Sequence, residues 1–139
     1  MADFRALLRA GSVPYIEGLF HMDGTVRRVT YDGPRLSRFD VGLPFVPTWQ
    51  DHPDDLVDID WADRAVLPGG QGYVCCGEGP MGADGFFARL DPDGAPIWVV
   101  FMTDSNPFLK ARIDGAVATF TNNLQRSVTI DLKLQYFAE

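Results

Sequence analysis

Apolar and polar residues alternate along much of the chain with the period of two that β-strands require. The clearest case is residues 56–61, whose alternation predicts a strand with Val57 and Trp61 in the core. The opposite face of that strand carries Asp58 and Asp60 toward solvent. The same alternation recurs in the second half of the chain, so strands rather than helices are expected to form most of the protein.

Short turn-forming sequences separate the alternating runs. Asp23–Gly24 and Asp114–Gly115 have the composition of tight hairpin turns, and residues 91–94 have that of a longer turn. Strands joined by such short connections pair antiparallel. The strands predicted in this way cover residues 15–22, 25–31, 38–41, 56–61, 71–76, 86–90, 97–103, 109–113, 116–121 and 127–134. The proline-rich residues 43–53 are expected to form a loop.

The run at residues 97–103 is apolar on both of its faces. Trp98, Val100 and Met102 alternate with Val99 and Phe101, and none of these side chains is polar. A strand with two apolar faces is buried on both sides. We therefore expect this strand in the interior of the sheet.

Residues 3–10 predict a short helix that ends at Gly11. So short a helix is not stable alone and has to pack against the sheet. The predicted fold is mainly β, with an α+β arrangement left open: a twisted antiparallel β-meander that forms a sandwich or half-barrel, with the helix at its N-terminus. A length of 139 residues fits one domain, residues 1–139.

Composition and charge narrow the classes of function. Apolar residues make up 46% and charged residues 22% of the chain, as in soluble globular proteins. No apolar run approaches the roughly 18 residues of a membrane span, and Arg5 and Arg9 interrupt the apolar stretch at the N-terminus. We expect no membrane association. A net charge of −7 argues against a nucleic-acid-coating protein and favours a basic partner.

Most of this negative charge lies in one segment. Six Asp and no Lys or Arg occur between Asp51 and Asp63. One interpretation is a solvated edge strand whose charges prevent pairing with another sheet. The other is a contact surface: Asp58 and Asp60 would lie roughly 7 Å apart on one strand face, close to the phosphate spacing of a nucleic-acid strand. Such a row of carboxylates could occupy a basic groove.

The residues that usually carry catalysis or bind metals are few. Cys75 and Cys76 are adjacent and would point to opposite faces of a strand, which predicts two buried, reduced thiols and a cytoplasmic location. His21 and His52 lie in no motif with a serine or cysteine. We therefore expect no metal, no cofactor and no catalytic triad.

A glycine-rich segment, residues 77–85, joins two of the predicted strands. It does not match a phosphate-binding loop, because Pro80 interrupts it, no lysine follows and both flanks are strands. Two interpretations remain: a long hairpin loop in which glycine supplies positive φ, or a recognition loop lined by backbone.

Four segments carry a resemblance to a known family. They are Gly77-Glu-Gly-Pro-Met-Gly-Ala-Asp-Gly-Phe-Phe87, Ile97-Trp-Val-Val-Phe101, Ser105-Asn-Pro-Phe108 and Thr121-Asn-Asn123. Together they resemble a GEGSxGxDGF…W…F…SNPF…NN layout of small bacterial proteins associated with polymorphic-toxin and contact-dependent-inhibition systems, where they act as immunity proteins. Pro80 and Met81 depart from that layout. The resemblance implies a non-enzymatic inhibitor that binds a co-encoded toxin in the cytoplasm of the producing cell.

The expected partner is therefore a cognate toxin domain, such as a basic nuclease, a deaminase or a similar enzyme. Charge attraction would speed the association, and exposed aromatics would anchor it. The residues predicted to contact the partner are Asp54, Asp55, Asp58, Asp60, Asp63, Trp49, Glu78 and Asp84.

Two other functions stay open from the sequence. One is a β-domain that binds a small ligand in a pocket lined by Phe, Tyr and Trp at the mouth of a half-barrel. The other is an enzyme that uses Asp and Arg side chains, such as Asp84 with Arg89. A deep apolar cavity would favour the former, and clustered Asp and His with shifted pKa values would favour the latter.

Overall fold

The computed structural model describes residues 3–48 and 56–134. The predicted N-terminal helix is present as α1 (Phe4–Arg9). Asp3 caps it by accepting a hydrogen bond from the Arg5 N–H at 3.0 Å. Hydrogen bonds from the Arg5 side chain and backbone lower the pKa of Asp3 to about 2. The capping carboxylate is therefore charged over the physiological range, which stabilises the start of this short helix.

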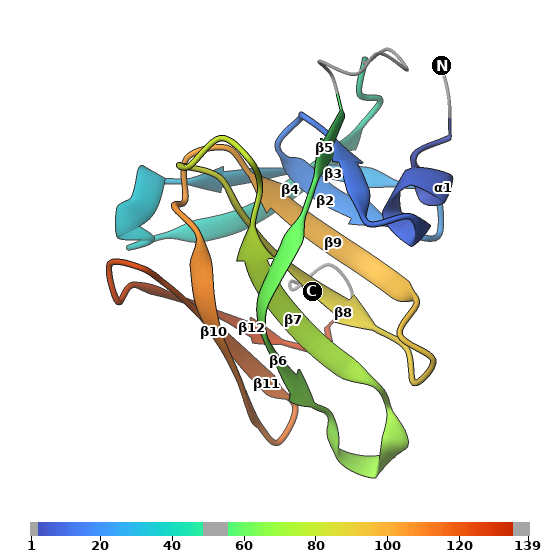
Figure 1. Cartoon of the computed structure of the whole chain (residues 1–139), viewed down its shortest axis with the longest axis vertical. Coiled ribbons are helices and arrows are strands. Elements are labelled where there is room, and N and C mark those ends of the chain that lie inside the picture. The colour runs from blue at the N-terminus through green and yellow to red at the C-terminus, as the bar shows by residue number, and fades with distance from the viewer. Residues whose placement is uncertain (1–2, 49–55, 135–139) are drawn as a thin grey trace.

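In the described ranges, the largest sheet has seven strands, and all of its neighbouring pairs are antiparallel. Strands β2 to β4 form one meander, β6 to β9 form a second, and the two join where β2 pairs with β9 (Figure 1). In spatial order the strands are β4 (Phe39–Phe45), β3 (Val26–Tyr31), β2 (Gly18–His21), β9 (Pro96–Met102), β8 (Gly85–Leu90), β7 (Tyr73–Glu78) and β6 (Asp60–Val66).

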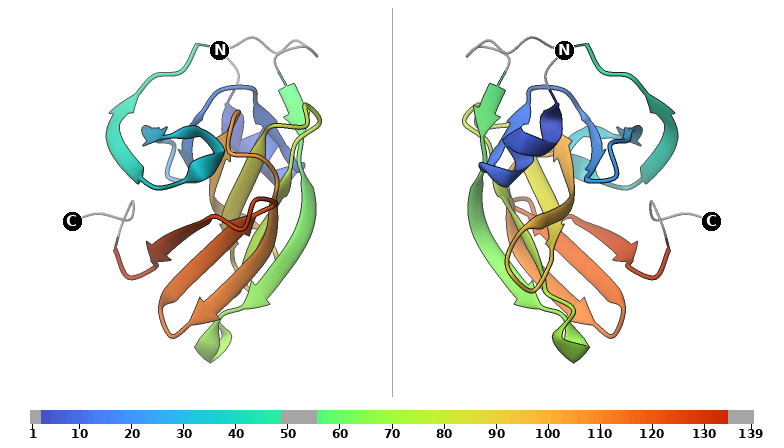
Figure 2. Two further views of the ribbon diagram at one scale, coloured as in Figure 1. Left: turned by 90° about the vertical axis from the view of Figure 1, so that its left-hand side faces the viewer. Right: turned by 90° about the vertical axis from the view of Figure 1, so that its right-hand side faces the viewer.

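Two smaller antiparallel sheets complete the strand arrangement of the described residues. The C-terminal sheet contains β10 (Phe108–Asp114), β11 (Val117–Asn122) and β12 (Ser127–Asp131). The other is a ribbon of β1 (Ser12–Pro14) and β5 (Leu56–Asp58). Figure 2 shows the C-terminal sheet and the helix on different sides of the long sheet. The fold is mainly β and antiparallel, as predicted, and its sheets do not close into a barrel.

Strand β9 lies fourth of the seven, in the middle of the long sheet. Trp98, Val100 and Met102 on one face, and Val99 and Phe101 on the other, are all buried. The two-sided apolar pattern thus correctly predicted an interior strand, because each face of β9 is covered by a separate layer.

The long sheet separates two hydrophobic cores. The core toward the C-terminal sheet is centred on Phe87, whose ring stacks on Phe120 at 4.4 Å and meets the ring edges of Phe108 and Trp98. The opposite core lies under α1 and the β1–β5 ribbon. Its larger members are Phe4, Leu8, Val13, Phe20, Val57, Phe86 and Phe101.

The two cysteines divide between these cores. Cys76 belongs to the core around Phe87 and Cys75 to the core under α1, as expected for neighbours on one strand. Both are free and fully buried. Burial raises the pKa of each thiol to about 12, with a smaller contribution from Cys76 for Cys75 and from Asp63 for Cys76. A raised pKa keeps a thiol protonated and unreactive. The prediction that both cysteines are buried is confirmed.

A network of polar hydrogen bonds stabilises the region where the two meanders join, near the paired strands β2 and β9. Tyr31, at the end of β3, donates a hydrogen bond to Glu17, and the same carboxylate accepts the N–H of Thr103 at 3.0 Å. The Asp104 N–H donates to the Tyr31 hydroxyl at 2.9 Å. Burial and the bond to Glu17 raise the pKa of Tyr31 well above its usual value, so its hydroxyl stays a donor.

The Ser-Asn-Pro-Phe and Asn-Asn segments have a structural role. The Asn122 amide is buried and donates to the backbone oxygens of Pro34 at 2.8 Å and Ser105 at 2.9 Å. Its Oδ1 accepts the N–H groups of Leu124 and Arg126. Every hydrogen-bonding group of this amide is therefore used to hold three loops together.

Several details differ from the sequence prediction, and two of them have a clear structural cause. Strand β4 continues to Phe45, into the part of the segment predicted as loop, because its residues pair with β3. Leu109, at the start of the strand predicted over residues 109–113, is 49% exposed, although regular alternation would place it on the same face as buried Ala111. The β10–β11 register shifts between Phe108 and Lys110, and this irregularity turns Leu109 outward. Of the helices in the described ranges, none has the length and apolar character that crossing a bilayer requires.

Candidate functional site

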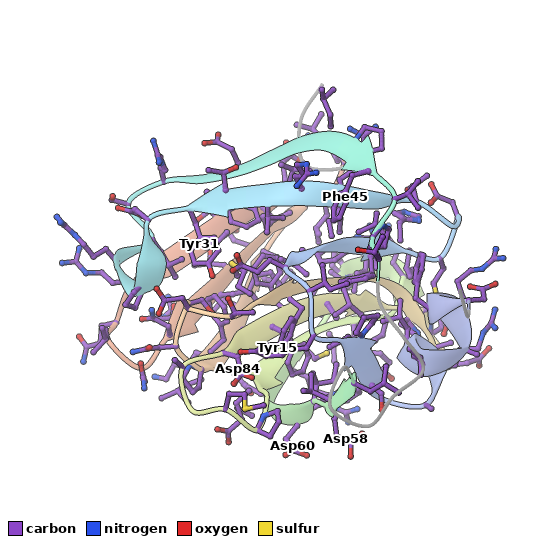
Figure 3. The ribbon with its side chains drawn as sticks, turned by 90° about the horizontal axis from the view of Figure 1, so that it is seen from above. Tyr15, Tyr31, Phe45, Asp58, Asp60 and Asp84 are labelled. Atoms are coloured by element: carbon purple, nitrogen blue, oxygen red, sulfur yellow. The ribbon has the colours of Figure 1, made fainter. Side chains whose placement is uncertain are left out.

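Three exposed carboxylates lie where the outer edge of the long sheet meets the β1–β5 ribbon; we call Asp58, Asp60 and Glu78 the acidic edge. Asp60 and Glu78 are directly opposite each other where β6 pairs with β7, so their side chains lie on the same face. Asp58 ends β5, and its Oδ1 accepts a hydrogen bond from the Ser12 hydroxyl at 2.7 Å. Figure 3 shows Asp58 and Asp60 at the same border of the molecule, directed outward.

The predicted strand at residues 56–61 is in fact two strands. Residues up to Asp58 pair with β1, and residues from Asp60 pair with β7. The chain passes from one sheet to the other at Ile59, whose N–H donates to Gly11 O at 3.1 Å. The acidic edge therefore spans the border between the two sheets.

Among the described residues, no cation forms an ion pair with Asp60 or Glu78. Within residues 3–48 and 56–134, ion pairs join only Arg5 to Asp3 and His21 to Asp23. Like charges directly opposite on neighbouring strands destabilise a sheet by a few tenths of a kcal/mol, up to about 1 kcal/mol. The acidic edge therefore opposes folding slightly.

Two large apolar side chains flank the acidic edge. Trp61, next to Asp60, is 49% exposed, and Met81, in the loop after Glu78, is 59% exposed. The prediction that Trp61 faces the core is wrong. Trp61 lies opposite Gly77, before the register shift, on the face of β6 that is opposite to that of Asp60. Because β6 is an outermost strand of the long sheet, the indole is left half exposed there. This edge thus exposes both the charges and the apolar side chains that protein interfaces use.

Asp63 belongs to the same strand but has a different environment. It is half-buried, and its Oδ2 accepts the backbone N–H of Ala111 at 3.0 Å. This bond ties β6 to β10, a strand of the other sheet. Asp63 therefore has a structural role where the sequence predicted a contact with a partner.

Asp84 is fully buried and so does not contribute to an exposed surface, which corrects its assignment as a contact residue. Its Oδ2 accepts the Met81 N–H at 3.4 Å, and a Cβ at position 79 would stand 2.4 Å from the same oxygen. Asp84 and Gly79 thus shape the loop that presents Met81. In Figure 3 Asp84 lies inside the molecule, beside Tyr15.

Three residues predicted to contact a partner lie outside the described residues: Trp49, Asp54 and Asp55. Of the eight predicted contact residues, the structure brings together Asp58, Asp60 and Glu78. Trp61 and Met81 were missed. The exposure of Trp61 depends on the place of β6 at the edge of the sheet, which local sequence does not reveal. The loop position of Met81 is indicated by the glycines around it.

The features expected of an enzyme or ligand site are arranged differently from the sequence hypotheses. Asp84 and Arg89 lie at opposite ends of β8, roughly 16 Å apart along the strand, so they do not form one site. Two of the cavities, one beside the β10–β11 turn and one beside the β11–β12 turn, have no Phe, Tyr or Trp among their described lining residues. Over the described ranges, no three His, Cys, Asp or Glu side chains are grouped as metal ligands would be.

Comparisons with known proteins give no relative for this chain: no family model, no curated protein and no solved structure matches it.

Proposed function

We propose that this chain is a non-enzymatic inhibitor, an immunity protein that binds a co-encoded bacterial toxin in the cytoplasm through its acidic edge. The observation that supports this most directly is the opposed pair Asp60 and Glu78, exposed and without a cation among the described residues. A pair that costs folding energy is understandable where a partner supplies the missing positive charge.

The flanking side chains support the same proposal. Trp61 and Met81 are both about half exposed or more, and aromatic and Met side chains are enriched in protein interfaces. They would contribute the apolar contact, while the carboxylates would attract the partner from a distance. The preferred partner is therefore a protein with a basic, concave surface, as nucleic-acid-processing enzymes have.

A solvated edge strand is the competing explanation for the charges alone. Negative charge on an outer strand does prevent unwanted pairing with other sheets. Protection of the edge does not require an exposed indole beside the charges, and an apolar side chain there works against it. The combination favours a binding surface.

The test uses the product of the gene adjacent to the one for this protein. The two proteins are purified separately, and association rates are measured at low and high salt for the wild type and for the double variant Asp60→Asn, Glu78→Gln. We expect association to slow by about 3- to 10-fold in the double variant at low salt, since steering by charge is lost. The difference should shrink as salt screens the charges.

The matched control is Asp93→Asn, which removes one exposed carboxylate in the turn between β8 and β9. Its association rate should stay close to that of the wild type. Trp61→Ala should instead speed dissociation, because the indole acts after contact. If the two proteins do not associate, the proposed function is wrong. If they associate but the double variant binds as fast as the control, the assigned surface is wrong.

A further inference from the structure

At the far end of β6 and β7 from the acidic edge, the long sheet and the C-terminal sheet border a half-open cavity of about 310 Å³. Its apolar walls include Leu67, Pro68 and Leu132, and its polar lining consists of Gln71, Arg89 and Lys133. The turn between β10 and β11 closes one side. In Figure 1 this turn and the β6–β7 connection both lie at the lower end of the molecule.

Arg89 directs its side chain into the space between the sheets. It lies opposite Val74 on β7 and Trp98 on β9, and both of these neighbours belong to the core around Phe87. Its Nη1 donates to the backbone oxygen of Leu132 at 3.4 Å, a long bond. Its Nε is buried and has no hydrogen-bond partner.

None of the described residues that line this cavity is acidic. In a chain with a net charge of −7, two cations, Arg89 and Lys133, therefore border one cavity with no carboxylate among its described lining residues. A partly buried cation loses hydration. An anion in the cavity would offset that loss.

The lining defines the chemistry of such an anion. A guanidinium donates planar, charge-assisted hydrogen bonds that match the oxygens of a carboxylate. Lys133 is exposed at the rim and adds a second positive charge. The apolar walls fit a short hydrocarbon chain better than a second charged group. The volume lies at the lower end of the range for small-molecule pockets.

We infer that this cavity is a binding site for a small organic carboxylate, with the carboxylate on Arg89 and an aliphatic tail against Leu67, Pro68 and Leu132. The site does not depend on the proposed inhibitor function. Asp60 and the cavity lie at opposite ends of β6, roughly 20 Å apart along the strand. A partner on the acidic edge and a ligand in the cavity could be bound together.

The test is a titration of the full chain, followed by backbone amide NMR, with three probes: valerate, acetate and inorganic phosphate. We expect saturable shifts from valerate at the amides of residues 115–116 and 132. Valerate should bind at least 5-fold more tightly than acetate, because its tail is buried on the walls. It should also bind more tightly than phosphate. An absence of saturation by valerate, or tighter binding of phosphate, would overturn the inference.

Variants then assign the anion contact. Arg89→Gln should weaken valerate binding by at least 10-fold, and Arg89→Lys should restore only part of it, because an ammonium lacks the planar fork. The control is Arg126→Gln, an exposed cation in the turn at the other end of the C-terminal sheet, which should leave binding unchanged. If Arg89→Gln and Arg126→Gln lost the same affinity for valerate, the loss would come from the change in net charge. That result would contradict the proposed site.

Because Arg89 also contacts Leu132, its variants could lose the fold. Lys133→Gln avoids this difficulty, since the Lys133 side chain is exposed and its replacement leaves the core intact. We expect a 2- to 3-fold weaker affinity for valerate with an unchanged amide spectrum in the absence of the probe. Unchanged affinity in Lys133→Gln, together with unchanged affinity in a folded Arg89 variant, would refute the inference.

Discussion

The middle and the edge of the seven-stranded sheet obey different constraints. On β9 both faces are covered, and Trp98 is 6% exposed. On β6, residues 60–62 are all exposed, and Trp61 is 49% exposed. The same residue type is thus a core anchor on one strand and a surface feature on another. Position in the sheet, and not hydrophobicity alone, decides what a tryptophan does in this protein.

This contrast separates residues that hold the fold from those free to bind. Side chains of β9 contact the layers on both sides, so each is constrained by packing. At the start of β6, Asp60 and Trp61 face solvent, so substitutions there change the surface and leave the interior intact. The candidate interface therefore lies where the fold tolerates change.

The largest expected effect tests the contrast between the two tryptophans. Trp98→Ala removes a buried ring next to Phe87 and should lower the free energy of unfolding by about 3–5 kcal/mol. Trp61→Ala should change it by about 0.5 kcal/mol or less, because the indole is exposed. Urea unfolding of both variants measures the difference. Comparable losses would mean that the edge is as tightly packed as the middle.

A second comparison concerns how closely the edge strand approaches its neighbour. A Cβ on Gly77 would lie 1.8 Å from the backbone oxygen of Asp60, so Gly77→Ala must push β6 away from β7. We expect a loss of about 3 kcal/mol, at the upper end of the range for overpacking. Gly42→Ala on β4 is the control, since its Cβ would meet nothing closer than 3.7 Å. A tolerated Gly77→Ala would show that β6 is loosely attached.

The smallest expected effects on stability distinguish two carboxylates of strand β6. Asp63→Ala leaves the Ala111 N–H without its acceptor and should cost about 1–2 kcal/mol. Asp60→Ala removes a charge that faces Glu78 and should be neutral, or stabilising by a few tenths of a kcal/mol. Thermal unfolding of the two variants side by side gives the sign of each. A destabilising Asp60→Ala would mean that this carboxylate has a structural partner.

Local sequence patterns correctly predicted most strands and turns. Asp23–Gly24 and Asp114–Gly115 form the expected tight turns, with Gly24 and Gly115 at φ of 98° and 61°. The two-sided pattern of residues 97–103 predicted the place of β9, because burial on both faces leaves no polar position in the strand. These features depend on neighbours in sequence, which a single chain displays.

The misplaced residues lie where the alternation of apolar residues gives no sign of exposure. Leu109 lies in a register shift, where one extra residue breaks the alternation. Trp61 lies on an outermost strand of the long sheet, and its place there depends on the strand order. The pairing of β2 with β9, and that of β1 with β5, also joins segments far apart in sequence, which local periodicity does not specify.

The candidate site was predictable only in part. Asp58, Asp60 and Glu78 were selected for their charge, and the β6–β7 register brings the last two together. Asp63 and Asp84 were selected on the same ground, but a hydrogen bond and a close-packed loop take them out of the exposed surface. Charge shows that a residue prefers water, whereas the fold determines whether it has access to water.

The pairing of β2 with β9 has a consequence for how the chain folds during synthesis. The hydrogen bond from the Thr103 N–H to Glu17, next to this pair of strands, joins residues 86 positions apart. All other strand pairs in the long sheet join consecutive strands. Closing so large a loop is slow compared with forming a hairpin. A strand as apolar as β9 would be prone to aggregate while its edge waited for a partner. Strands β2 to β4 leave the ribosome before β9, so β2 is already synthesised when β9 emerges. We therefore expect less aggregation during synthesis from the N-terminus than during refolding from denaturant.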